Sequence, residues 1–295
     1  MRATHKQAIV RVQRRKRDRG AMGHPLLKLL LVGLLVGATL PGKLALAGSA
    51  PGTGIVQSVH DFTNPAGFAY YNGARRGDAS ICVFCHVPHR NSASPTAQTR
   101  LLWNHTLSSS GTFKWSDVDR TVNGTLLPAI ASSVGMSKLC LSCHDGTVSV
   151  GDVYRANGVE GLTFTDSWTG AGVDASGKLG NLLPGNVIGG NGDLKGNHPV
   201  GIPFPYGSVP NIYNGVTTGA GIDYADYVTS PVNVKLFTDV GGDWIQGATD
   251  GRSGIECASC HDPHNKKTLD NWLLRDYYRA ATGAPSQLCL DCHNK

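Results

Sequence analysis

The pattern Cys-x-x-Cys-His occurs four times in this chain of 295 residues and uses all eight of its cysteines. The four copies read CVFCH, CLSCH, CASCH and CLDCH, and they begin at Cys82, Cys140, Cys257 and Cys289. Two cysteines at this spacing can add their sulfurs to the two vinyl groups of one porphyrin, and the adjoining histidine then reaches its iron. A single copy could be a chance match, a redox pair or half of a zinc site. Four copies that leave no cysteine over predict four covalently attached c-type haems.

Each motif supplies two thioether anchors and one proximal iron ligand. The predicted anchors are Cys82, Cys85, Cys140, Cys143, Cys257, Cys260, Cys289 and Cys292. The predicted proximal ligands are His86, His144, His261 and His293. Outside the cytoplasm such cysteine pairs could also form disulfides, but the histidine that follows every pair favours haem. A zinc or disulfide protein is the alternative, and it would lack the haem absorption bands.

The four motifs fall into two similar halves. Each half opens with C-x-x-C-H-x-P-H, at Cys82 and Cys257, and closes with L-C-L-x-C-H, as KLCLSCH and QLCLDCH. We therefore expect one haem pair in residues 48–156 and a second in residues 198–295. A loop rich in Gly and Asn, at about 157–197, separates them.

The composition limits how much of a core the protein can build by itself. Hydrophobic residues make up 40% of the chain, and its 38 glycines are nearly double the average share of about 7%. We expect a mostly irregular, coil-rich multihaem cytochrome with a few short helices at the CxxCH motifs, minor β-strand, and a core built around four haems. Ser137 is the expected N-cap of a helix over Lys138 to His144 that stops at Gly146. Further expectations are a helix over Leu269 to Ala281 and strands over Ile55 to Val59 and Val232 to Thr238.

Residues 1–47 have the pattern of a secretory signal peptide. A basic region precedes the apolar run Leu29 to Leu40, and an A-x-A-like end follows at Ala45 and Ala47. Twelve residues are too few for the roughly 20 that cross a bilayer, so we expect no membrane span in the mature protein. Met22 is an alternative start that would give a leader of ordinary length.

The basic net charge of +6 comes from this leader. Residues 1–47 hold ten of the 27 Lys and Arg and one of the 21 Asp and Glu, which leaves 17 basic and 20 acidic residues. A nucleic-acid partner is therefore not expected, and the chain is predicted to be secreted.

The distal iron ligands must come mainly from histidine. Outside the leader and the motifs lie five histidines: His60, His89, His105, His198 and His264. Met136, the single methionine after the leader, is expected to be a packing residue. Since His/Met ligation raises the potential of a cytochrome c, a set ligated by histidine alone should have low potentials.

We predict His60, His89, His198 and His264 as the distal ligands. His89 and His264 follow their motif histidines by three, on the chain's own side of the porphyrin, so each should ligate a different haem. His198 lies in a segment without an apolar face, and Asp61 could orient the ring of His60. His105 is the expected spare, although it could replace one of the four.

Several stretches in chain order resemble the doubled-CxxCH multihaem cytochromes, and among them the OmcE-like tetrahaem cytochromes that polymerise into extracellular filaments. They are VHDF (59–62), CVFCHVPH (82–89), LLWNHT (101–106), CLSCHDGTV (140–148), NHPVG (197–201), IECASCHDPH (255–264) and LCLDCH (288–293). The resemblance implies bis-histidine haems in a continuous chain and haem contact between subunits. It also implies that a C-x-x-C-H-x-x-H histidine, His89 or His264, completes a haem in the neighbouring subunit. The Gly-rich loop and the long leader have no counterpart in the resemblance.

The sequence therefore predicts an electron-transfer protein and not an enzyme, with itself and other redox proteins or extracellular acceptors as partners. A monomeric periplasmic electron shuttle with the same haems is the first alternative. A multihaem reductase acting on a nitrogen or sulfur oxyanion is the second, but it needs an iron with one open position. Five spare histidines for four irons argue against such a position.

Overall fold

The computed structural model describes twelve stretches of the chain and a few shorter pieces. The described residues are 51–56, 58–62, 81–87, 101–114, 130–131, 135–156, 159–163, 174, 176–179, 193–195, 197–218, 222–241, 243–269, 272–277 and 286–294. All of them lie in one compact unit, Leu46–Lys295. The predicted leader and His89 lie outside the described residues.

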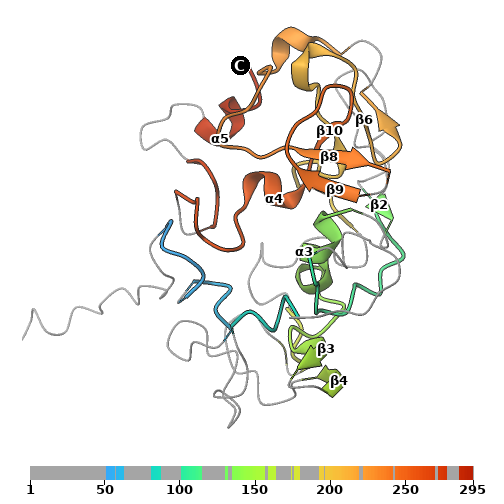
Figure 1. The fold of residues 1–295 in the computed structure, drawn as a ribbon, viewed down its shortest axis with the longest axis vertical. Coiled ribbons are helices and arrows are strands. Elements are labelled where there is room, and N and C mark those ends of the chain that lie inside the picture. The colour runs from blue at the N-terminus through green and yellow to red at the C-terminus, as the bar shows by residue number, and fades with distance from the viewer. Residues whose placement is uncertain are drawn as a thin grey trace, which may run out of the picture. The chain divides into compact units, whose positions relative to one another are not determined.

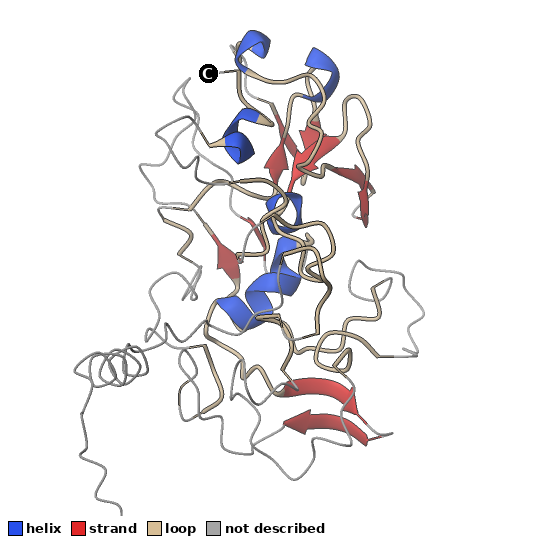
Figure 2. Ribbon diagram, turned by 90° about the vertical axis from the view of Figure 1, so that its left-hand side faces the viewer, coloured by secondary structure: helices blue, strands red, loops and turns tan. Residues whose placement is uncertain are grey.

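The helices are few and short, and three of them carry haem motifs (Figures 1 and 2). Helix α3 contains the whole second motif, α4 contains the cysteines of the third, and α5 contains the first cysteine of the fourth. The helices are α3 (Ser137–His144), α4 (Cys257–Cys260), α5 (Gln287–Leu290) and the 3₁₀ turns η2 (Tyr206–Ser208) and η3 (Tyr224–Asp226). The first motif forms a single turn, in which the His86 N–H donates to the Cys82 carbonyl at 2.7 Å. Residues three and four apart share one face of a helical turn, so each turn presents both sulfurs and the histidine on the same side.

In the part of the chain that the structure describes, the strands form one four-stranded sheet and three two-stranded ribbons, all antiparallel. The ribbons pair β1 (Thr112–Phe113) with β2 (Ile130–Ala131), β3 (Asp152–Ala156) with β4 (Val159–Thr163), and β6 (Ile212–Tyr213) with β7 (Val216–Thr217). The sheet has the order β5-β10-β8-β9, formed by β5 (Ile202–Pro203), β10 (Ser253–Ile255), β8 (Phe237–Val240) and β9 (Asp243–Gln246). Strand β10 is internal and leads through Glu256 into α4, so the sheet fixes the position of the third motif (Figure 1).

The predicted helix of the second motif is confirmed, but its predicted cap is wrong. Helix α3 begins at Ser137 with Met136 as its N-cap residue, and the Ser137 side chain caps nothing in its own helix. Its hydroxyl donates to Glu256 instead. The helix ends where predicted. Gly146 adopts a φ of +70°, and a right-handed helix cannot continue through a residue in this conformation.

Three other local predictions need correction in the described residues. Residues 55, 56, 58 and 59 form turns and not a strand. Of the predicted strand from Val232 to Thr238, only Phe237 and Thr238 belong to a strand, namely β8. Residues 269 and 272–277 are not helical, since Leu273 has a φ of +60° and its carbonyl accepts the Asp262 N–H. Backbone hydrogen bonds join this stretch to the third motif, and these tertiary contacts override its helical spacing.

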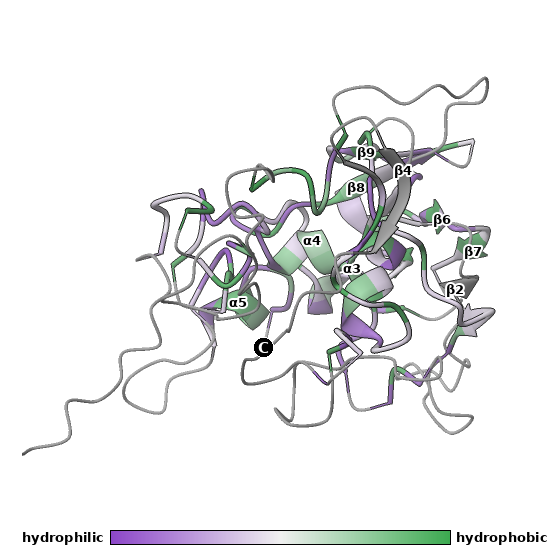
Figure 3. Ribbon diagram, turned by 90° about the horizontal axis from the view of Figure 1, so that it is seen from below, coloured by the Kyte–Doolittle hydropathy of each residue, from purple (hydrophilic) through white to green (hydrophobic). Residues whose placement is uncertain are grey.

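Two small apolar clusters anchor the helices of the second and third motifs. Tyr213, Phe237 and Trp244 form one cluster, with Met136 and Ala258 packed against it, so Met136 is a packing residue as expected. The other cluster consists of Phe113, Leu141 and Leu194, with Val200 against it. Helices α3 and α4 lie side by side, and both carry apolar residues, coloured green in Figure 3, beside polar ones. The clusters therefore hold two adjacent haem motifs together.

Gly254 in β10 packs directly beneath the ring of Tyr213. A Cβ atom at this position would lie 2.2 Å from the Tyr213 Cγ atom, although the backbone conformation suits any residue. Tyr213 is fully buried and cannot move aside. The glycine is therefore required by packing alone.

Replacing Gly254 by Ala should destabilise the haem-loaded protein by about 1–3 kcal/mol or more, since overpacking a buried site displaces its neighbours. The control is G111A, where a Cβ meets nothing within 4 Å and should change stability by less than about 0.5 kcal/mol. Denaturant unfolding followed by the visible haem bands measures both. Equal stability of the two variants would contradict this packing.

Candidate haem-binding sites

The first and third motifs are each held by a second segment with the same pattern of hydrogen bonds. After the first motif, the Val87 N–H donates to the Leu102 carbonyl and the Asn104 N–H donates to the Cys85 carbonyl. After the third, the Asp262 N–H donates to the Leu273 carbonyl and the Arg275 N–H donates to the Cys260 carbonyl. Leu101 to Asn104 thus corresponds to Trp272 to Arg275.

The side chains and backbone angles repeat as well. Asn104 Nδ2 donates to the Val83 carbonyl, and Arg275 Nε donates to the Ala258 carbonyl, one residue after the first cysteine in each motif. Leu102 and Leu273 both adopt a positive φ, of 52° and 60°, which is rare for a side-chain-bearing residue. Sequence reasoning found the repeat of the motifs but missed this second segment. The signal was present as an apolar triplet followed by a polar side chain, LLWN and WLLR.

These segments also orient the motif histidines. His86 Nδ1 lies 2.6 Å from the Leu101 carbonyl oxygen, and His261 Nδ1 lies 3.0 Å from that of Trp272. A carbonyl oxygen beside Nδ1 accepts a hydrogen bond from the Nδ1–H of the neutral ring. The Nε2 atom then carries no proton and is free to bind a metal. Two predicted distal ligands have the same arrangement: His60 Nδ1 lies 3.1 Å from the Pro263 oxygen, and His198 Nδ1 lies 2.9 Å from that of Pro199. The expectation that Asp61 orients His60 is therefore corrected, since the partner at Nδ1 is a backbone carbonyl.

Three motif histidines each face a histidine from a distant part of the chain. His60 lies against His144 with ring centroids 6.2 Å apart, and His86 lies against His264 at 6.1 Å. His198 lies against His293 at 6.5 Å. His264 is thus placed against the first motif and not against His261 of its own.

These spacings fit two imidazoles bound to one iron. A bond from a metal to a histidine nitrogen is about 2 Å long and the nitrogen lies about 1.1 Å from its ring centroid, so axial ligands on opposite sides have centroids about 6.3 Å apart. The donor set is also suitable, because a c-type haem takes a proximal His and leaves the opposite position for a second ligand. The residues present therefore fit a haem between each pair.

One turn holds two of the distal histidines. The His264 N–H donates to Asp262 Oδ1, and the next residue, Asn265, exchanges hydrogen bonds with the segment that leads to His60, one through its backbone and one through its side chain. Gly54 N donates to the Asn265 carbonyl at 2.9 Å, and Asn265 Nδ2 donates to the Gly54 carbonyl at 3.0 Å. The turn after the third motif therefore positions a ligand for the first motif and orients a ligand for the second.

Burial keeps the His60 ring neutral. The pKa of His60 is lowered to about 4, mainly by desolvation and secondly by the neighbouring His144. A neutral imidazole is the form that binds a metal. Protonation therefore does not compete for His60 near neutral pH.

His105 is placed differently from the distal candidates. It is 1% exposed, and its Nδ1 and Nε2 atoms lie 2.8 and 2.9 Å from the carbonyl oxygens of Thr106 and Ser149. Burial lowers its pKa, although both carbonyls oppose the shift. With both ring nitrogens facing backbone oxygens, His105 fits a structural role in the loop after the first motif.

Cysteines of successive motifs lie next to one another. The Cys140 and Cys257 side chains are hydrogen-bonded, Cys143 influences the pKa of Cys85, and Cys289 influences the pKa values of Cys260 and Cys292. All eight are free thiols in the structure, where each sulfur stands for the thioether of a haem-loaded protein. Burial raises the pKa of Cys85, Cys143 and Cys292 to about 12, so these thiols are protonated near neutral pH.

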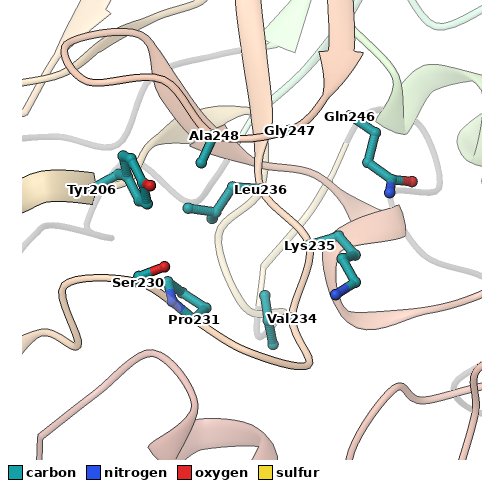
Figure 4. A pocket seen from close by; sticks show the side chains of 9 residues that line it. All are labelled: Tyr206, Ser230, Pro231, Val234, Lys235, Leu236, Gln246, Gly247 and Ala248. Atoms are coloured by element: carbon teal, nitrogen blue, oxygen red, sulfur yellow. The ribbon is translucent and has the colours of Figure 1, made fainter.

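A pocket outside the motifs contains none of the side chains that would bind haem. Nine residues line it (Figure 4): Tyr206, Ser230, Pro231, Val234, Lys235, Leu236, Gln246, Gly247 and Ala248. Its single charged group, Lys235 Nζ, donates to the Val232 carbonyl. No cysteine or histidine borders this pocket, and it is not part of the candidate site.

The comparison with protein families agrees with the second half of this site. Residues 251–295 match the family model described as the doubled CXXCH motif. This segment carries a c-type haem-binding motif pair. The match covers the third and fourth motifs, and it supports a multihaem c-type cytochrome that transfers electrons. No curated protein and no solved structure matches the chain. Among the residues that the structure describes, no helix is long and apolar enough to cross a membrane.

Replacing His198 by Ala should leave one iron with a single axial ligand. We expect one high-spin haem in four in the oxidised protein, and carbon monoxide binding by that haem after reduction. Electron paramagnetic resonance and the visible spectrum measure both. H198M should restore a six-coordinate iron and raise its potential.

The matched control is H105N, which removes a histidine that faces only backbone oxygens. All four haems should stay low-spin in this variant. If H198A remains fully low-spin, or if H105N opens an iron, the pairing of His198 with His293 is wrong.

Proposed function

We propose that this protein is a secreted tetrahaem c-type cytochrome that carries electrons from haem to haem. The observation that carries the proposal is the set of three histidine pairs, each spaced to bind one iron from both sides. When bound, each haem supplies a reversible one-electron couple. The chain supplies the thioether anchors, the axial imidazoles and the spacing, and no bond-making chemistry is assigned to it.

The ligand assignment follows from the pairs. His264 serves the haem of His86, His60 serves that of His144, and His198 serves that of His293. His261 remains for the fourth haem, and His89 is the predicted distal histidine left to serve it. Bis-histidine ligation at all four irons favours low potentials.

The contacts between cysteines favour a haem order that follows the chain. Cys85 neighbours Cys143, Cys140 contacts Cys257, and Cys260 neighbours Cys289. Each contact joins one motif to the next, so the edges of successive porphyrins would meet through their thioethers. The second and third haems have the closest such contact, and this joins the two halves of the molecule.

We further propose that the protein is the subunit of an extracellular conductive filament. The resemblance to the OmcE-like cytochromes supports this form. In the filament His89 of one subunit would complete the haem of His261 in its neighbour. A monomeric shuttle would instead bring His89 to His261 within one chain.

Replacing His89 by Ala distinguishes these two forms. In both, the variant should contain three low-spin haems and one high-spin haem, measured by electron paramagnetic resonance. In the filament, negative-stain microscopy of the secreted fraction should show that polymers form from the natural protein and are lost in H89A. The shuttle predicts monomers from both proteins in size-exclusion chromatography.

The matched comparison is H264A, which removes the corresponding histidine of the third motif. It should open the haem of His86 within each subunit. If polymers form in H89A but not in H264A, then His264 and not His89 completes the haem of the neighbouring subunit. That result would contradict our assignment.

A further inference from the structure

A buried polar cluster lies between the second and third haem motifs, and electron transfer alone gives it no role. Its centre is Glu256, which is 1% exposed and directly precedes Cys257. Glu256 Oε2 accepts from the backbone N–H of Ser137 at 2.9 Å and from its hydroxyl, and Oε1 accepts from the Tyr213 hydroxyl at 2.8 Å. None of these partners is an axial histidine.

Lys138 is the cationic member of the cluster. It is 2% exposed, and its Nζ atom has no hydrogen-bond partner among the described residues. Lys138 Nζ and Glu256 Oε1 each lie 3.7 Å from the point where a Cβ atom on Gly135 would stand, so they face the same small space. A buried lysine without a partner is costly in its charged form, and so is a buried carboxylate. The cluster can therefore change its charge more easily than a solvated ion pair.

The cluster touches the place where two porphyrins are expected to meet. The Ser137 hydroxyl that donates to Glu256 also accepts the Cys257 N–H at 2.9 Å. The Cys257 sulfur contacts that of Cys140, the first anchor of the second motif. Other ionisable groups near the carboxylate are Tyr213 on β6 and Asp239 on β8, which accepts the Asn214 N–H. The two sulfurs become thioethers and do not titrate once haem is attached.

We propose that the Glu256 carboxylate, opposite Lys138, is a proton-binding site that fills when the irons of the second and third motifs are reduced. Glu256 changes from carboxylate to carboxylic acid with a proton from water, while one electron from an external reductant converts a ferric iron to ferrous. The added negative charge raises the proton affinity of a carboxylate that solvent does not screen. Because the coupling is reciprocal, the bound proton raises the affinity of the same irons for electrons.

The pKa shifts agree with this geometry. Burial raises the pKa of Glu256, while hydrogen bonds from Ser137 and Tyr213 oppose the rise. Burial lowers the pKa of Lys138 to about 7, and Glu256 opposes that shift. The window of proton uptake lies between the pKa of Glu256 in the oxidised protein and its higher pKa in the reduced protein.

The test is a spectroelectrochemical titration of the haem-loaded protein at several pH values, and it rests on the proposed function. In that window the midpoint potentials of two of the four haems should fall as pH rises. Because one proton site is shared by two one-electron reductions, the slopes of the two potentials should add up to about 59 mV per pH unit, the one-electron equivalent of a tenfold change in proton concentration. E256Q should lose this slope, and D250N, which removes an exposed carboxylate, should keep it. Glutamine keeps an acceptor oxygen for Ser137 and can donate to Tyr213, so the variant preserves the fold.

Infrared difference spectra give a second readout. Reduction should produce the C=O band of a newly protonated carboxylic acid in the natural protein and in D250N, but not in E256Q. Y213F removes one hydrogen bond that lowers the pKa of Glu256, so its window should move to higher pH. If E256Q fails to assemble, an unmoved window in Y213F overturns the proposal.

The outcomes separate this inference from the function on which it rests. A slope that persists in E256Q assigns proton uptake to other groups, such as haem propionates, and overturns the proposal. Four low-spin haems with no pH dependence overturn it as well and leave electron transfer intact. If the natural protein binds no haem, both the proton-uptake proposal and the proposed electron-transfer function are wrong.

Discussion

In our proposal, the ligation of each iron by two imidazoles is the constraint on which the rest of this structure depends. A motif turn presents one histidine on one side of a porphyrin, and the second must come from a segment that is free to reach the opposite side. His60, His198 and His264 come from far along the chain to meet their partners. Under this proposal, iron bonds act as long-range cross-links, and they reduce the need for an extensive apolar core.

Backbone hydrogen bonds perform the positioning that long helices and sheets perform in other folds. Carbonyl oxygens fix the Nδ1 atoms of four histidines, and paired loops hold the first and third motifs in the same way. The buried carboxylate of Glu256 joins α3 to β6 and to the third motif. A chain with 38 glycines can make such loops because many of its turns need positive φ angles.

The sequence predicted the parts of the site that a local pattern encodes. The eight cysteines and the four motif histidines follow from their spacing, and the end of helix α3 follows from Gly146, whereas the predicted Ser137 cap is wrong. The sequence could not predict which histidine faces which motif, because that depends on loop paths of up to 178 residues, as between His86 and His264. The helix expected from Leu269 onward failed for the same reason. The backbone of the segment beside Trp272 is hydrogen-bonded to the third motif, and a helical pattern cannot reveal such a contact.

A density map of the haem-loaded protein, at a resolution that shows each porphyrin and its axial ligands, tests the ligand pairing most directly. We predict irons between His86 and His264, between His60 and His144, and between His198 and His293, with Cys140 and Cys257 in contact where the second haem meets the third. An iron bridged by any other combination of these six histidines would contradict the account.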